Sequence, residues 1–147
     1  MTTPPPNVQA LSALPHGREF RFVDEITDLV PGQSAVGFHT VQAEAEFLRG
    51  HFPGAPLFPG VLLIEALAQL GGTIGQTRPG VEPLAGLKLT AVQKFKITGS
   101  ALPGERIRIE AQLDSALGHV LQVSGRLFNG AGQPIAAGVV MLAGQAG

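Results

Sequence analysis

The chain has 147 residues, which is the length of one ordinary domain with enough residues to bury a core. Its net charge of −1, from 10 basic and 11 acidic residues, excludes the strongly basic surface that binding to nucleic-acid phosphates requires. The absence of cysteine excludes disulfides, thiolate metal sites and cysteine nucleophiles. Charged residues make up only 14% of the chain against a usual share of about 25%, so we expect part of the apolar surface to be buried against a second subunit.

The N-terminal part is predicted to be a tail followed by strands. Residues 1–13 are interpreted as a proline-rich tail with a short helix capped by Asn7, and residues 14–147 as a single domain. Alternation of apolar and polar residues predicts strands over 20–30 and 34–41. The start has no basic and apolar signal segment, and the longest apolar run is too short to cross a bilayer. We therefore expect a cytoplasmic protein without membrane contact.

The middle of the chain contains a loop followed by an apolar helix. After a helical turn expected over 43–48, residues 49–60 hold three prolines and three glycines, a density that no regular element tolerates. Residues 61–76 are apolar on every side, which predicts a helix that is buried all round. Its three glycines each lower helix propensity by about 1 kcal/mol relative to Ala, and we expect the close approach of another backbone to compensate.

The C-terminal half is predicted to consist of strands separated by glycine-rich turns. The strands are expected over 84–98, 106–114, 119–128 and 133–142. A single helix that is apolar all round has no other long helix to cover it, so the strands must curl around it. The predicted fold class is therefore α+β, with a long buried central helix wrapped by a curved antiparallel β-sheet.

Two residues are candidates for chemistry. Glu65 lies in the middle of the apolar helix, where a carboxyl is costly to bury unless it is paired or protonated. By position alone it is either a hydrogen-bonded carboxyl in a dimer interface or a functional acid, and His51 in the loop is either a packed side chain or a base. Gln69 lies four residues after Glu65 on the same helix face, close enough to orient it, and Gly72 and Gln76 continue that face.

The segment that holds both residues resembles the signature of a known enzyme family. It reads His51-Phe-Pro-Gly-Ala-Pro56, then Pro59-Gly-Val-Leu-Leu-Ile-Glu65-Ala-Leu-Ala-Gln69. This pattern, with Glu65 placed 14 positions after His51, is similar to that of the 3-hydroxyacyl-[acyl-carrier-protein] dehydratases of fatty-acid synthesis, the FabZ and FabA type. Leu14-Pro15-His16 and Leu102-Pro103-Gly104 resemble further parts of the family. The resemblance implies the hot-dog fold, a long helix wrapped by an antiparallel sheet.

The resemblance also implies an activity and the residues that carry it. The enzyme would be a hydro-lyase that dehydrates 3-hydroxyacyl thioesters to trans-2-enoyl thioesters. His51 would take the proton from C2 as the base, and Glu65 would protonate the departing C3 hydroxyl as the acid. The backbone N–H groups of Gly60 and Val61 would stabilise the charge on the thioester oxygen, with Gln69 supporting Glu65. No metal or cofactor is implied, because the substrate arrives on the phosphopantetheine arm of its carrier.

The partners follow from the same resemblance. His51 from one subunit and Glu65 from its partner would form each site, so the catalytic unit would be a homodimer, alone or within a trimer of dimers. The acyl chain would lie in an apolar tunnel along the helix. Acyl-carrier proteins are acidic, so docking would use the basic side chains of Arg49, Lys94 and Lys96. Strand geometry places the two lysines on one face, with Phe95 on the other.

Two other functions stay open. A hot-dog acyl-thioester hydrolase would need no His-Phe-Pro-Gly loop, and a catalytically silent acyl-binding subunit of a synthase complex would need neither His51 nor Glu65. Glu65 stands where relatives that also isomerise their product have Asp, which favours dehydration alone. The chain departs from the family pattern at positions near the tunnel entrance and the docking surface, namely Gly17, Arg18, Ala55, Phe58 and Gly99.

Overall fold

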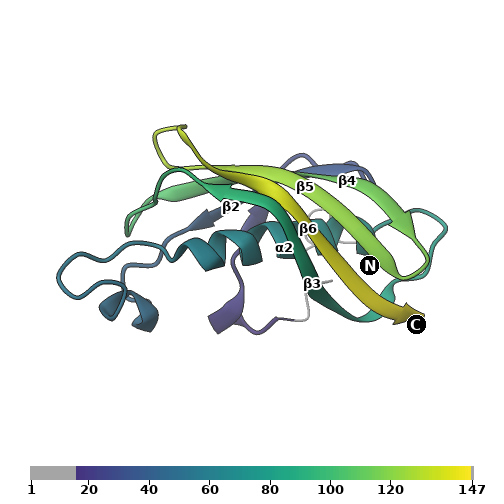
Figure 1. Ribbon diagram of the computed structural model, residues 1–147, viewed down its shortest axis with the longest axis horizontal. Coiled ribbons are helices and arrows are strands. Elements are labelled where there is room, and N and C mark those ends of the chain that lie inside the picture. The colour runs from purple at the N-terminus through teal and green to yellow at the C-terminus, as the bar shows by residue number, and fades with distance from the viewer. Residues whose placement is uncertain (1–15, 147) are drawn as a thin grey trace, which may run out of the picture.

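One long helix lies under a curved antiparallel sheet in the computed structural model, which describes residues 16–146 (Figure 1). In chain order the elements are η1 (Arg18–Phe20), β1 (Glu25–Ile26), β2 (Ser34–Thr40), η2 (Glu46–Arg49), α2 (Gly60–Gln76), β3 (Leu84–Ile97), β4 (Arg106–Leu117), β5 (Val120–Phe128) and β6 (Pro134–Ala146). The six strands form one sheet in the order β1-β2-β4-β5-β6-β3, and all neighbouring pairs are antiparallel. The predicted α+β hot-dog architecture is confirmed. None of the helices in the described range is long and apolar enough to cross a membrane.

Helix α2 is buried because its apolar residues occupy most of its sides. The side chains of Leu63, Leu67, Leu70 and Ile74 expose 1% or less of their surface. They pack in one core with inward-facing residues of the strands, among them Ile107, Ile109, Leu121, Val123, Leu127 and Val140. The helix therefore has a fixed position under the sheet, and so has any polar group that it carries.

The glycines of α2 leave room for side chains of the sheet to pack directly against the helix. A Cβ atom at Gly71 would lie 2.7 and 2.8 Å from the two Cγ atoms of Val123 on β5. A Cβ atom at Gly75 would collide with Leu121 on the same strand. The expected approach of another backbone is thus wrong, because branched side chains of the chain's own sheet occupy the space. Their packing accounts for glycine at positions where it lowers helix propensity.

The strand predicted over 20–30 is mostly wrong. β1 has only two residues, and Phe22 and Val23 are both buried instead of alternating. The backbone N–H of Phe22 donates to Gln69 Oε1 at 2.8 Å, so the chain is tied to helix α2 at this residue, and its pairing with β2 begins only at Asp24. The strand over 34–41 is confirmed as β2, and the turn over 43–48 forms slightly later, as η2. The tail over 1–13 and its helix at Asn7 lie outside the described residues.

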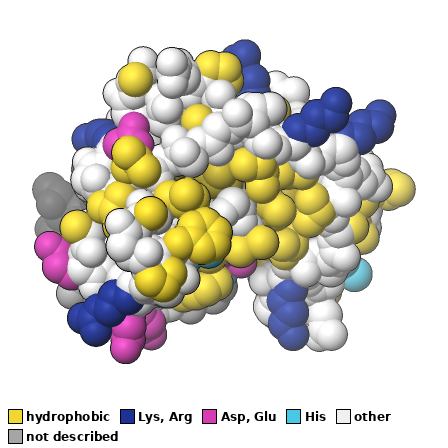
Figure 2. Space-filling model, turned by 60° about the vertical axis from the view of Figure 1, so that its left-hand side comes forward, with side chains coloured by type: hydrophobic (Ala, Val, Ile, Leu, Met, Phe, Trp, Pro, Cys, Tyr) yellow, Lys and Arg dark blue, Asp and Glu magenta, His cyan; other side chains and the backbone are white. Residues whose placement is uncertain are grey.

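Strand β3 is one edge of the sheet. It pairs only with β6 within the described chain, and its register shifts at three places along that pairing. Leu89, Val92 and Ile97 on this strand expose 38%, 44% and 48% of their surface. Figure 2 shows apolar side chains gathered over a broad area of one face of the molecule. An apolar edge with free backbone groups is a common place for contact with a second chain.

Candidate active site

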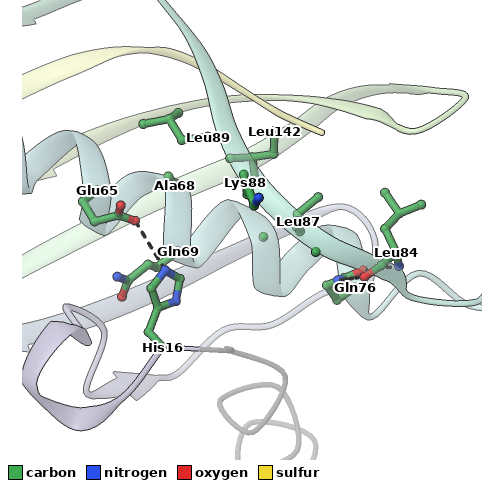
Figure 3. A pocket seen from close by; sticks show the side chains of 12 residues that line it. His16, Glu65, Ala68, Gln69, Gln76, Leu84, Leu87, Lys88, Leu89 and Leu142 are labelled. Atoms are coloured by element: carbon green, nitrogen blue, oxygen red, sulfur yellow. Dashed lines mark hydrogen bonds and ion pairs between the residues drawn. The ribbon is translucent and has the colours of Figure 1, made fainter. Parts of the chain in front are cut away.

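A cavity of about 420 Å³ lies between α2 and β3, with Glu65 near one end (Figure 3). The predicted stripe of Glu65, Gln69, Gly72 and Gln76 faces this cavity together with Ala68. The opposite wall is formed largely by leucines of β3 and β6, namely Leu84, Leu87, Leu89 and Leu142. The small residues of the helix face these leucines and leave a mostly apolar channel along α2. Its volume falls in the lower part of the range of roughly 300–1,000 Å³ that is usual for small-molecule sites.

Glu65 is the acidic group of this cavity. Its side chain exposes 22% of its surface, and the apolar helix around it removes much of the water that would solvate a carboxylate. Burial raises the pKa of the Glu65 carboxyl, although the charge of His16 and the amide of Gln69 act in the opposite direction. The carboxyl consequently keeps its proton to a higher pH than an ordinary glutamate, as a general acid requires.

Gln69 joins the helix to the segment before β1. Its Oε1 accepts the N–H of Phe22 at 2.8 Å, and its Nε2 donates to the carbonyl of Phe20 at 2.9 Å. These two bonds hold the N-terminal segment against α2, one turn away from Glu65. Gln69 was expected to support Glu65, and its amide lowers the pKa of that carboxyl, while its other two bonds position the backbone that passes the carboxyl.

His51 lies in the proline-rich loop before α2 and is half-buried. Its Nδ1 is 3.1 Å from the carbonyl oxygen of Leu57, which can only accept, so Nδ1 carries the hydrogen and donates. The neutral ring therefore has Nε2 unprotonated and able to take a proton. His51 is not among the described residues that line the cavity with Glu65. Within one chain, the structure does not bring the two predicted catalytic residues into one cavity.

The first turn of α2 offers two free backbone donors. The helix begins at Gly60 after Pro59, which contributes no side-chain cap. Leu62 N–H donates to the carbonyl of Pro59, whereas the N–H groups of Gly60 and Val61 make no hydrogen bond within the described chain. A Cβ atom at Gly60 would lie 2.8 Å from Ile97 Cδ1, so glycine lets β3 pass close to the helix start. Free donors at the positive end of a helix dipole suit a developing oxyanion.

The cavity also contains two groups that the prediction of the site did not include. His16 Nε2 lies 3.9 Å from Glu65 Oε2, and Lys88 on β3 lines the same space. His16 belongs to the Leu-Pro-His motif, which resembles part of the family pattern but does not by itself indicate a place in the site. No sequence pattern predicts that Lys88 lines the cavity, because its position there depends on how β3 crosses the helix.

The basic residues expected to dock the carrier lie in two places. Arg49 ends η2 and is exposed, two residues before His51. Lys94 and Lys96 line a different, open groove, together with Glu110 and Arg126. Phe95 between them packs against the core, so the two lysines share one side of the sheet although the register shifts there.

Two of the departures from the family pattern have a structural reason. Phe58 is 1% exposed and meets the rings of Phe22 and Phe47 at centroid distances of 5.8 and 6.2 Å, so it fills the core. A Cβ atom at Gly99 would lie 2.8 Å from Ile135 Cγ2, which leaves no room for a larger residue. Neither residue lines the cavity that contains Glu65.

Known proteins with similar sequences share this region. The model of the FabA-like domain matches residues 14–133. The chain is 35% identical to the 3-hydroxyacyl-[acyl-carrier-protein] dehydratase FabZ of Syntrophotalea carbinolica over 118 residues, which are 80% of each protein. It is 37% identical to the protein of that name from Nitratidesulfovibrio vulgaris over 119 residues, which are 77% of each.

Solved structures agree on the fold. The dehydratase heterocomplex ApeI:P from Xenorhabdus doucetiae matches with a TM-score of 0.76 and 16% identity over 94% of this chain and 90% of that one. A thioesterase superfamily member from Thermus thermophilus matches with a TM-score of 0.61 and 21% identity over 79% of this chain and 83% of that one. At these identities the structural likeness establishes the hot-dog fold alone. The family match and the two curated relatives go further, and the chain belongs to the FabA-like family.

Proposed function

We propose that this protein dehydrates 3-hydroxyacyl-[acyl-carrier-protein] thioesters to trans-2-enoyl thioesters in fatty-acid synthesis. The observation that carries the proposal is the half-buried Glu65 carboxyl, with a raised pKa, at one end of an apolar channel. A protonated carboxyl beside a channel that fits an acyl chain is suited to expelling a hydroxyl group from that chain. The names of the curated relatives support the same reaction.

Each residue has one role in the proposed reaction. His51 Nε2 removes the proton from C2, while the bond from its Nδ1 to Leu57 keeps the ring in the required tautomer. The charge that develops on the thioester oxygen is stabilised by the N–H groups of Gly60 and Val61. Glu65 then donates its proton to the C3 hydroxyl, which departs as water. The reaction as proposed uses no metal and no cofactor apart from the phosphopantetheine arm of the substrate.

The active site is proposed to form between two subunits. Glu65 lines its cavity without His51 of the same chain, so the proposed base would come from a second subunit. The apolar edge strand β3 supplies a surface on which a second copy can pack, as do exposed Phe52 beside His51 and Val61 at the start of α2. We expect light scattering to give a dimer, or a hexamer made of three dimers. A stable monomer at micromolar concentration would contradict this assembly.

The direct test of the reaction is product analysis with two carrier-linked substrates. The protein is incubated with 3-hydroxybutyryl- and 3-hydroxydecanoyl-carrier protein, and trans-2-enoyl product is the expected outcome. Release of free carrier thiol and hydroxy acid would instead indicate a thioester hydrolase. Binding without either product would indicate a silent acyl-binding subunit. The relatives with dehydratase names favour the first outcome.

The far end of the channel is proposed to limit the length of the acyl chain. Gln76 Nε2 donates to the carbonyl of Leu84 at 2.7 Å, and the N–H of Leu84 donates to Gln76 Oε1 at 2.8 Å. This reciprocal pair joins the last residue of α2 to the first residue of β3 and closes the end that Figure 3 shows opposite Glu65. At a rise of about 1.5 Å per residue, the helix between Glu65 and Gln76 is about 16 Å long.

Gln76→Ala is therefore expected to change the preference for chain length. Loss of the pair opens the end of the channel, and kcat/KM for a 16-carbon substrate should rise about five-fold or more relative to the four-carbon substrate. Gln42→Ala, at an exposed loop position, is the matched control and should leave the ratio unchanged. A wild-type ratio in Gln76→Ala would show that the channel ends elsewhere.

Docking of the acidic carrier is proposed to use Arg49, Lys94 and Lys96. Reversing Lys94 and Lys96 to Glu is expected to raise KM for carrier-linked substrate several-fold, and added salt should weaken the wild-type interaction. KM for an N-acetylcysteamine thioester should stay nearly constant, because this substrate has no acidic partner to dock. Equal losses on both substrates would show that the lysines support the fold. No loss on either would leave Arg49 as the candidate, to be tested by Arg49→Glu.

A further inference from the structure

His16 lies beside the carboxyl that is proposed to act as the acid. Its Nε2 is 3.9 Å from Glu65 Oε2, at ion-pair distance, as the dashed line in Figure 3 marks. The two side chains expose 28% and 22% of their surface, so both are partly shielded and both reach solvent. They come from different parts of the fold, His16 from the segment before η1 and Glu65 from the second turn of α2.

The fold holds this imidazole in place through several contacts. The two bonds of Gln69 to the backbone of Phe20 and Phe22 hold the N-terminal segment against α2. The guanidinium of Arg21 donates to the carbonyl of His16 at 3.2 Å, and the ring of Phe20 stacks on the imidazole at a centroid distance of 6.1 Å. These contacts place the imidazole next to Glu65, although its buried Nδ1 has no hydrogen-bond partner among the described residues.

The proposed reaction leaves Glu65 in need of a proton. In each turnover Glu65 loses its proton to the departing hydroxyl, and His51 gains the proton from C2. The next turnover needs Glu65 protonated again and His51 neutral. Besides the partner subunit's His51, which the proposed dimer adds to the site, His16 and Lys88 are the titratable groups among the described residues that line the cavity of Glu65. Imidazole is the side chain that accepts and donates protons most readily near neutral pH.

We propose that His16 returns the proton to Glu65 after each turnover, an inference that rests on the dehydration proposed above. In this step the Nε2–H bond of the His16 imidazolium breaks and an O–H bond forms on the Glu65 carboxylate. A small rotation of either side chain closes the 3.9 Å separation to hydrogen-bond length. His16 is then neutral, and its Nε2 takes a proton from water, while His51 releases its own proton to water. His16 acts through Glu65, as a positioning and proton-supplying residue.

The same contact gives a second, independent signature in the pH dependence. The charge of His16 lowers the pKa of Glu65, against the larger effect of burial. Among the residues that the structure describes, the charged or polar groups lining the cavity around Glu65 are His16, Gln69, Gln76 and Lys88, and of these His16 alone is within ion-pair distance of it. Removing the charge of His16 should raise the pKa of Glu65, and the alkaline limb of kcat/KM, which reports loss of the proton from the free acid, should move to higher pH.

The test compares His16→Gln with His119→Gln. Glutamine keeps the polarity of His16 but cannot exchange a proton. His119 is an exposed histidine in the β4–β5 turn. We expect His16→Gln to lower kcat about ten-fold or more with little change in KM. Added imidazole should restore part of the lost kcat, and the alkaline limb should move upward. His119→Gln should match the wild type in all three measurements.

Other results would overturn the inference. An unchanged kcat in His16→Gln would show that the proton reaches Glu65 by another route. A lower kcat that imidazole does not restore, with a lower melting temperature, would assign His16 a purely structural role. Failure of the dehydratase proposal itself is distinguishable, because the wild type would then form no enoyl product. If the wild type is active and Glu65→Gln is not, a normal His16→Gln contradicts the proton return alone.

Discussion

His51→Ala and Glu65→Gln are each expected to lower kcat for dehydration by about 10²–10⁴-fold, the range usual for loss of a general acid or base. Alanine removes the imidazole that is proposed to take the C2 proton. Glutamine keeps the size and hydrogen-bonding capacity of Glu65, and so its place in the cavity, but it cannot protonate a leaving hydroxyl. The double variant should be little worse than either single variant, because both residues serve one reaction and their effects do not add.

The controls separate catalysis from folding. Glu44→Gln removes a carboxylate from an exposed loop position, and His119→Ala removes an exposed histidine, so neither should change kcat. All four variants should melt cooperatively and elute like the wild type. If His51→Ala kept a turnover near that of the wild type, the assignment of the base would be wrong.

The C-terminal half of the fold could be predicted closely because its signals are local. Alternation along 106–114 and the glycine-rich turns around it place β4 to β6 in the right order, although β6 continues to Ala146, past its predicted end at 142. β4 continues to Leu117, past the predicted end at Asp114. A register shift between Leu113 and Ser115 interrupts the alternation there, but pairing with β5 resumes afterwards. The extra residue of such a bulge breaks the alternation of apolar and polar residues, although the strand itself continues.

The region before β2 could not be predicted because its partners are distant in sequence. The backbone of Phe22 bonds to the side chain of Gln69, 47 residues later, and no periodicity reports a bond of this kind. The sequence does not predict His16 as part of the site for the same reason, since its contact with Glu65 exists only after the segment folds against α2. Glu65 itself was recognisable because a carboxyl in an apolar helix conflicts with its surroundings, and such conflicts are frequent at functional sites.

The proposed division of the site between two subunits leads to the second large prediction. His51→Ala and Glu65→Gln proteins, each inactive alone, are expected to regain activity when the two are co-expressed. In a mixed dimer, one site combines His51 from the Glu65→Gln subunit with Glu65 from the His51→Ala subunit. Random pairing makes about half of the dimers mixed, each with one intact site, so activity should reach about a quarter of the wild-type value per subunit.

The turnover of this co-expressed mixture tests directly whether each site takes His51 from one subunit and Glu65 from the other. The matched control pairs His51→Ala with the double variant, a combination in which no site contains both residues and no activity should return. If the site is shared, we expect turnover to recover to about a quarter of the wild-type value in the first mixture and not in the control. A first mixture as inactive as its control would contradict it, because both residues of each site would then come from the same chain.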